Sequence, residues 1–261
     1  MDIAAYNREA WAKEVAEGNK WTIPVDAATI ERARRGDWSL LLTPTIPVPR
    51  EWYGTIEDAR VLCLASAGGQ QGPVLAAAGA RVAVLDNSPA QLERDAFVAQ
   101  REGLGLELVQ GDMRDLSRFA DSSFDLVFHP VSNCFVDDVE IVWRECHRVL
   151  RPGGRLLAGF CNPLTYIFDL KAWDEEGALK VKYRIPYSDL EQLPKDELEE
   201  RMRAKEALEF GHSLDAQIGG QIAAGFAIAG FFEDDRGGDL LDPYIKTFIA
   251  TLAVKGWSRQ G

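Results

Sequence analysis

The strongest constraint in this sequence is a short apolar run that leads directly into a turn of small residues. Val61–Leu64 is apolar, and residues 65–72 read Ala-Ser-Ala-Gly-Gly-Gln-Gln-Gly. Small residues at such a turn let backbone N–H groups at the start of the following helix approach a ligand. A second apolar run ends at Asp86, about twenty residues after the turn, where a carboxylate can accept both hydroxyls of a ribose. The near match of Ala67-x-Gly69-x-x-Gly72 to G-x-G-x-x-G therefore predicts a nucleotide-like ligand.

After this turn the sequence alternates between predicted strands and helices. Ser88 is placed to cap a helix, Pro89 fits its first turn, and Gln91 completes a capping box. Apolar residues recur at helical spacing up to Leu150, and this helix is expected to stop at Pro152. This alternation predicts an α/β fold. Further strands are expected over residues 82–85, 107–109, 124–128 and 155–160.

The succession of these elements resembles the class I S-adenosylmethionine-dependent methyltransferases. The resemblance covers roughly residues 51–160 and two C-terminal strands expected over 226–232 and 246–255. It implies a Rossmann-like three-layer sandwich with a mostly parallel seven-stranded sheet that ends in an antiparallel hairpin. The expected single domain divides into an N-terminal cap (1–55), a cofactor-binding core (56–160), a lid inserted after the fifth strand (161–214) and a C-terminal core helix with strands (215–261).

The same resemblance implies S-adenosyl-L-methionine as cofactor and S-adenosyl-L-homocysteine as its product. The glycine turn would bind the methionine end, Asp86 would hold the ribose, and Asp112 would accept a hydrogen bond from the adenine amino group. Residues 129–134 would lie where cofactor and acceptor meet. The implied cofactor-binding residues are Ala65, Ser66, Ala67, Gly68, Gly69, Gln70, Asp86, Asn87, Ser88, Gln91, Gly111, Asp112, Met113, His129, Pro130, Val131 and Cys134.

The turn departs from the family pattern at three positions. The usual turn begins with an acid and continues with alternating glycines, whereas Cys63, Ala65 and Ala67 stand at the first three of these positions. Alanine fits where the backbone does not need a positive φ. The missing acid often orients the turn in this family. We interpret the differences as a subfamily variation.

The two additions are predicted to cover the core. Asn7–Glu17 is expected to be helical, and Trp21, beside a proline turn, is expected to line the acceptor pocket. In the lid, Val181–Tyr187 alternates like a half-buried edge strand, whose tyrosines could line the pocket, pack as a cover or form a dimer contact. The charged helix that follows is expected to present the ion pairs Glu197–Arg201 and Glu199–Arg203 to solvent.

Methyl transfer from a sulfonium depends mainly on aligning donor and acceptor and on excluding water. A hydroxyl acceptor also needs a base, whereas a neutral amine does not. His129, after the fourth strand, and His212, before the last helix, are the candidate catalytic residues, with a structural role as the alternative for each. Asn162, Tyr166 and Asp169, just past the fifth strand, are further candidates for the substrate pocket.

Composition narrows the class of partners. The net charge of −12 opposes nucleic-acid binding, which needs clustered Lys and Arg, and the one dense basic run, Arg32–Arg35, is expected to be a solvated helix face. The four cysteines form no Cys-x-x-Cys pattern, so neither a disulfide framework nor a metal site is expected. No apolar stretch is long enough to span a bilayer, and no signal peptide is expected. We therefore expect a cytoplasmic monomer or homodimer that acts on a small molecule, without a membrane or nucleic-acid partner.

These observations predict an S-adenosylmethionine-dependent methyltransferase that acts by in-line transfer on an oxygen, nitrogen or carbon nucleophile of a small molecule. One alternative is a NAD(P)-dependent oxidoreductase, which would share the turn and Asp86 but would not need Asp112 or the terminal hairpin. The other alternative is a non-catalytic protein that binds the same cofactor and lacks an open acceptor pocket.

Overall fold

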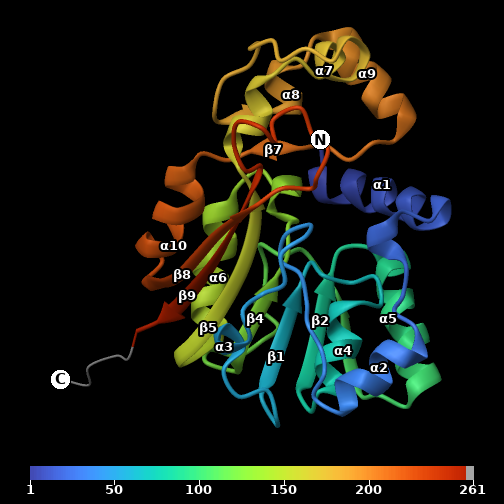
Figure 1. The fold of residues 1–261 in the computed structure, drawn as a ribbon, viewed down its shortest axis with the longest axis vertical. Helices are drawn as coiled ribbons and strands as arrows, with labels where there is room; N and C mark the ends of the chain where they lie inside the picture. Colours follow the sequence, from blue (N-terminus) through green and yellow to red (C-terminus); the bar gives the residue numbers. More distant parts are fainter. Residues whose placement is uncertain (257–261) are drawn as a thin grey trace.

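A seven-stranded sheet forms the centre of the molecule (Figure 1). The computed structural model describes residues 1–256. The strand order is β3–β2–β1–β4–β5–β9–β8; β9 runs antiparallel to both of its neighbours, and the other pairs are parallel. The predicted sheet, mostly parallel and ending in an antiparallel hairpin, is confirmed. Its strands are β1 (Arg60–Leu64), β2 (Arg81–Asp86), β3 (Leu106–Gln110), β4 (Phe124–His129), β5 (Leu150–Cys161), β8 (Phe226–Asp234) and β9 (Phe248–Lys255).

Helices cover both faces of this sheet, as the predicted three-layer sandwich requires. Side chains of β1 alternate between two apolar cores because successive residues of a strand point to opposite faces. Val61 and Cys63 belong to one core, and Leu62 and Leu64 belong to the other, where they share a cluster with Trp143. The first face carries α2 (Ala27–Arg34), α4 (Gln71–Ala77) and α5 (Pro89–Glu102), and the second carries α6 (Val139–Val149) and α10 (Gly220–Ala223).

Capping side chains set the ends of the long helices. The first helix, α1 (Ile3–Glu17), begins earlier than the predicted Asn7, because Asp2 Oδ1 accepts a hydrogen bond from Ala5 N at 3.0 Å. At the start of α5, Ser88 Oγ accepts from Gln91 N at 3.4 Å, as predicted, but Gln91 does not complete the capping box, because Ser88 N donates to Asp86 Oδ1 instead. The remaining short elements of the cap and core are α3 (Arg50–Tyr53) and single 3₁₀ or π turns at Lys20–Thr22, Asn133–Phe135, Pro163–Ile167 and Asp215–Gly219.

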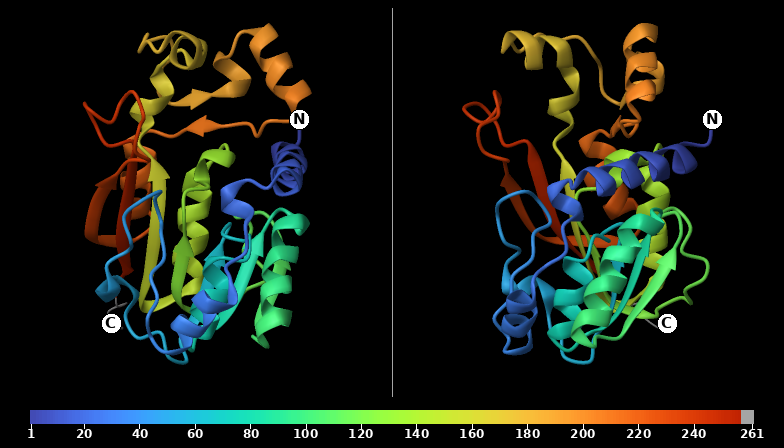
Figure 2. Two further views of the ribbon diagram at one scale, coloured as in Figure 1. Left: turned by 45° about the vertical axis from the view of Figure 1, so that its right-hand side comes forward. Right: turned by 90° about the vertical axis from the view of Figure 1, so that its right-hand side faces the viewer.

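The inserted segment lies over the carboxyl ends of the parallel strands, with α1 beside it (Figure 2). It contains a small antiparallel sheet as well as three helices. Among the described residues, no helix is both long enough and apolar enough to cross a membrane. The elements of this lid are α7 (Leu170–Glu176), β6 (Tyr187–Ser188), α8 (Asp189–Gln192), α9 (Lys195–Ala204) and β7 (Phe210–Gly211).

The predicted edge strand over Val181–Tyr187 does not form. Val181 makes one isolated bridge to Phe168, and regular pairing begins only at Tyr187. The backbone of Arg184 pairs with a side chain and not with a strand. Gln192 accepts a hydrogen bond from Arg184 N at 3.0 Å and donates one to Arg184 O at 3.1 Å. A side chain that satisfies both backbone groups of one residue removes the need for a neighbouring strand.

The structure also lacks both ion pairs that were predicted along α9, within the described residues. Arg201 is mostly buried, and its Nη1 lies 2.8 Å from Asp189 Oδ2. Glu197 instead lies 3.2 Å from Lys182 Nζ, and Arg203 donates to a backbone oxygen of α9. One face of this charged helix therefore packs inward, because the lid offers buried partners that spacing along the helix does not reveal.

The N-terminal cap packs tightly on β5 at Gly159. A Cβ added at Gly159 would lie 2.2 Å from the backbone oxygen of Leu42. We expect Gly159→Ala to lower the free energy of unfolding by about 1–3 kcal/mol, as overpacking does, in urea titrations. Gly105→Ala is the matched control, since a Cβ there meets nothing within 4 Å and the effect should be small. Equal unfolding midpoints for the two variants would contradict this packing.

Candidate active site

A cavity of about 600 Å³ lies between the carboxyl ends of the parallel strands and the lid. Open α/β sheets bind ligands at this edge. One half is formed by the segments that follow β1, β2, β3 and β4, and the other half by the cap, the lid and the hairpin between β8 and β9. The predicted cofactor-binding residues that line the cavity are Ala65, Ser66, Ala67, Gln70, Asp86, Asn87, Gln91, Gly111, Asp112, Met113, Pro130, Val131 and Cys134. Gly68, Gly69, Ser88 and His129 are not among the lining residues.

The turn after β1 differs from the expected geometry. Ala65 has a φ of +46°, so an alanine does occupy a left-handed position here. Gly68 and Gly69, with φ values of +120° and +74°, direct their N–H groups to the Asp95 carboxylate, at 2.8 and 3.0 Å, rather than to the cavity. Glycine is required at position 68, because a Cβ there would lie 2.6 Å from the backbone oxygen of Trp21.

Asp86 stands at the end of β2 and lines the cavity. Its Oδ1 accepts a hydrogen bond from Ser88 N at 2.9 Å, and its Oδ2 accepts one from Ala67 N at 3.2 Å. Burial raises the pKa of this carboxyl to about 6. A carboxylate oxygen can accept more than one hydrogen bond, so two adjacent ribose hydroxyls fit as further donors.

Other polar side chains of the wall also fit a cofactor with many hydrogen-bonding groups. Ser66 Oγ, Gln71 Oε1 and Gln91 Oε1 are buried and have no hydrogen-bond partner within residues 1–256. All three residues line the cavity. Buried polar atoms normally have partners, so these three atoms are suited to pair with a ligand.

Asp112 and Met113 line the cavity beyond β3, but the Asp112 carboxylate is shared with Arg114. Arg114 Nη2 lies 2.6 Å from Asp112 Oδ2, and Arg114 Nη1 lies 2.5 Å from Asp137 Oδ1. The backbone N of Arg114 also donates to Asp112 Oδ1, at 2.8 Å. A hydrogen bond from an adenine amino group would therefore have to use a lone pair that Arg114 leaves free.

The two histidines predicted as catalytic lie outside the cavity lining. His129 is fully buried, and its Nδ1 donates to the backbone oxygen of Leu64 at 2.9 Å. Burial lowers the pKa of His129 to about 4, so its ring is neutral near pH 7. His212 Nε2 lies 3.0 and 2.9 Å from the backbone oxygens of Asn133 and Val136, to which it donates. The structure therefore places neither imidazole on the cavity wall, which favours the structural role that is the alternative for each.

The structure places only some of the predicted pocket residues in the cavity lining. Trp21 and Tyr166 line the cavity, whereas Asn162 and Asp169 do not. Asn162 caps the turn that follows β5, where its Oδ1 accepts from Leu164 N at 3.1 Å. Asp169 caps α7 and lies 3.2 Å from Lys182 Nζ. Both polar side chains thus hold the start of the lid in place.

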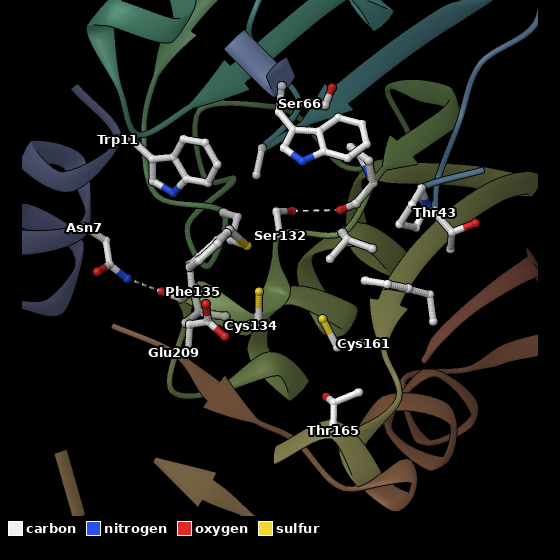
Figure 3. Close-up of a pocket in the computed structure, with 18 of the residues that line it drawn as sticks. Asn7, Trp11, Thr43, Ser66, Ser132, Cys134, Phe135, Cys161, Thr165 and Glu209 are labelled. Atoms are coloured by element: carbon white, nitrogen blue, oxygen red, sulfur yellow. Dashed lines mark hydrogen bonds between the residues drawn. The ribbon is translucent and has the colours of Figure 1, made fainter. Parts of the chain in front are cut away.

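The lid contributes a half-buried acid, Glu209, that no sequence motif indicated. Its Oε2 accepts a hydrogen bond from Tyr166 OH at 2.9 Å, and both residues line the cavity. Burial raises the pKa of Glu209. Cys134 and Cys161 also point into this part of the cavity (Figure 3).

A buried acid, Asp189, fixes the backbone of Glu209. Asp189 accepts hydrogen bonds from Glu209 N at 2.8 Å, from Tyr187 OH at 2.7 Å and from Arg201 Nη1 at 2.8 Å. The Arg201 charge is paired with Asp189, which is 1% exposed. The Glu209 carboxylate, by contrast, is held by the neutral hydroxyl of Tyr166. Within residues 1–256, no group of three or more His, Cys, Asp and Glu side chains is placed to hold a metal ion.

The fold and this cavity define an α/β protein with a site for a nucleotide-type cofactor beneath a lid. Residues 62–158 match the family described as Methyltransferase domain. The uncharacterized methyltransferase YbaJ of Bacillus subtilis is 52% identical over 253 residues, which are 97% of this chain and 98% of that protein. The chain belongs to the class I S-adenosylmethionine-dependent methyltransferases.

Solved structures agree at the level of the fold. A Mesorhizobium loti S-adenosylmethionine-dependent methyltransferase is 18% identical, with a TM-score of 0.61 over 79% of this chain and 95% of that one. The Burkholderia thailandensis 1,6-didemethyltoxoflavin-N1-methyltransferase, solved with its substrate and S-adenosylhomocysteine, is 18% identical, with a TM-score of 0.57 over 97% of this chain and 89% of that one. Family membership favours the methyltransferase prediction over the oxidoreductase alternative.

Proposed function

We propose that this enzyme transfers the methyl group of S-adenosylmethionine to a small molecule that binds in the lid half of the cavity. The observation that carries this proposal is a single continuous cavity that joins Asp86 and Asp112 at one end to Glu209 and Tyr166 at the other. The first pair suits a ribose and an adenine. The second pair is enclosed by lid side chains, which suits an acceptor shielded from water.

The cofactor would lie along the polar half of this cavity. Asp86 is proposed to accept the ribose hydroxyls, Gln91 and Ser66 to offer their unpartnered oxygens, and Met113 to pack against the adenine ring. When bound, the cofactor supplies a sulfonium-activated methyl group. The protein then has to align the acceptor with this group and exclude water.

The lid half is proposed to hold a flat, largely apolar acceptor. Eight aromatic side chains line it and would give such an acceptor a large contact area. Tyr166 and Tyr187 are stacked with ring centroids 5.5 Å apart, and Tyr187 and Tyr183 are 5.2 Å apart. The aromatic lining residues of this half are Trp11, Trp21, Tyr166, Phe168, Trp173, Tyr183, Tyr187 and Phe248.

Glu209 is proposed as the base for an acceptor that presents an O–H or N–H group. Its carboxylate lines the cavity and accepts a hydrogen bond from the neutral Tyr166 hydroxyl, whereas Asp189, which also lines the cavity, is paired with the Arg201 charge. A raised pKa moves a carboxyl toward the range in which it can take a proton near neutral pH. The acceptor proton would pass to Glu209 as the oxygen or nitrogen attacks the methyl carbon.

Calorimetry tests the choice of cofactor directly. We expect the purified protein to bind S-adenosylhomocysteine in the micromolar range and to show no heat with NAD, because the Gly68 and Gly69 amides donate to Asp95 and are not directed to the cavity, where a pyrophosphate would need them. Tighter binding of NAD would contradict the proposal. Incubation with methyl-deuterated S-adenosylmethionine and metabolite extracts, followed by mass spectrometry, would then identify acceptors by the label that they gain.

A further inference from the structure

Asp95 is a fully buried carboxylate that holds the glycine turn from behind. It lies on α5 and is 0% exposed. Its Oδ2 accepts hydrogen bonds from Gly68 N at 2.8 Å and from Gly69 N at 3.0 Å. Hydrogen bonds to a carboxylate are stronger than those between neutral groups, so one oxygen here fixes two successive peptide units.

Asp86 and Asp95 together receive three consecutive amides of the turn. Ala67 N donates to Asp86, and the next two amides donate to Asp95. Asp86 ends β2 just before the Ser88 cap of α5, and Asp95 lies within α5. The turn is therefore oriented from β2 and α5 rather than from its own strand.

The strand position that carries an acid in related turns holds Cys63 here. Cys63 is fully buried in β1, and both burial and the nearby Asp95 charge raise the pKa of its thiol. Gly72 leaves room for the carboxylate, since a Cβ at this position would lie 3.2 Å from Asp95 Oδ1 and 2.7 Å from Val84 Cγ2. An acid at position 63 would bring a second buried negative charge close to Asp95, which is unfavourable.

We propose that Asp95 supplies, from α5, the turn-orienting carboxylate that position 63 of β1 lacks. Asp95 is thus a positioning residue: it does not line the cavity, but it holds the turn that presents Ala67 and Gln70 to it. The inference rests on the proposed cofactor site for its effect on binding, while its effect on the turn is independent of any ligand.

Amide hydrogen exchange measured by NMR on the ligand-free protein tests the effect on the turn. In Asp95→Ala we expect exchange at Gly68 and Gly69 to accelerate at least tenfold, because both amides lose their acceptor, while exchange at Leu62 in β1 stays unchanged. Glu93→Ala, an exposed acid on the same helix, is the control and should leave both glycines as in the wild type. Unchanged exchange at the two glycines in Asp95→Ala would overturn the proposal, whatever the cofactor is.

Calorimetry with S-adenosylhomocysteine tests the effect on binding by moving the carboxylate from position 95 to position 63. We expect Asp95→Ala to raise the Kd at least tenfold. Adding Cys63→Asp to that variant should lower the Kd again by at least threefold. The same Cys63→Asp change in the presence of Asp95 should weaken binding. Equal effects of Cys63→Asp in both backgrounds, or a folded Asp95→Ala that binds like the wild type, would overturn the proposal. Failure of the wild type to bind would instead count against the proposed function.

Asp95→Asn keeps an acceptor oxygen and covers the case in which Asp95→Ala does not fold. Burial raises the pKa of Asp95 to about 7, so the carboxylate charge develops as the pH rises through this value. The ratio of wild-type affinity to Asp95→Asn affinity should therefore increase between pH 6 and pH 8.5, as the stronger acceptor forms. A ratio that stays constant over this range would contradict a role for the charge.

Discussion

Replacing Asp86 with alanine should weaken binding of S-adenosylhomocysteine by about 1–3 kcal/mol or more, roughly fivefold to more than a hundredfold, because the ribose hydroxyls lose their buried acceptor. The loss should exceed that of an ordinary hydrogen bond, since Ala67 N and Ser88 N also lose their partner. Isothermal titration calorimetry measures the change. Glu107→Ala, an exposed acid on β3, is the matched control and should bind as the wild type does.

The pH dependence of the same site provides a second readout. Burial raises the pKa of Asp86 to about 6, well above the ordinary value of an aspartate. The ionised carboxylate is the proposed acceptor of the ribose hydroxyls, so the contribution of Asp86 to affinity should decline as the pH falls through about 6. For folding the sign is opposite: the folded state holds this proton more tightly than the unfolded chain, so Asp86 lowers the free energy of unfolding as the pH rises from about 4 to about 6. Affinity that is flat from pH 5 to pH 8 would contradict the assigned role.

The sequence predicted the core of this protein because its signals are local. Strands and helix caps are encoded within a few residues, and the sheet follows from their order. The same reasoning placed His129 at the carboxyl edge of the sheet but did not determine the face to which its side chain points. Alternation along β4 places Phe128 in one core and turns His129 toward Trp143 of α6. A residue can therefore lie at the correct edge of the sheet and still be absent from the cavity.

The lid could not be predicted to the same extent because tertiary contacts decide its structure. Gln192 hydrogen-bonds to the backbone N and O of Arg184. Asp189, rather than the expected Glu197, forms an ion pair with Arg201. Glu209 reaches Tyr166 only because β6 and β7 pair and bring distant parts of the lid together. The acceptor half of the site thus depends on contacts between residues that share no motif, whereas the cofactor half follows strand ends that the sequence marks clearly.

Changing Glu209 to glutamine should lower kcat by about 10² to 10⁴, the usual contribution of a general base, once an acceptor with an O–H or N–H group is in hand. Glutamine keeps the shape and can still accept a hydrogen bond from Tyr166 OH through its amide oxygen, but it cannot take a proton. Binding of S-adenosylhomocysteine should stay within about twofold, because Glu209 lies in the lid half of the cavity. Single-turnover assays with labelled cofactor separate the two effects.

Two histidine variants serve as controls for the Glu209→Gln experiment. His129→Asn and His212→Gln can keep the hydrogen bonds to backbone oxygens that the imidazoles make, so both should retain kcat once they are shown to fold. The raised pKa of Glu209 predicts a wild-type rate that increases with pH as this carboxyl ionises, and Glu209→Gln should remove this limb of the profile. A Glu209→Gln enzyme with wild-type kcat and an intact limb would show that the proton leaves by another route. A large loss of kcat in either histidine variant would return that imidazole to the reaction, and the cavity would then have to open toward α6 during turnover.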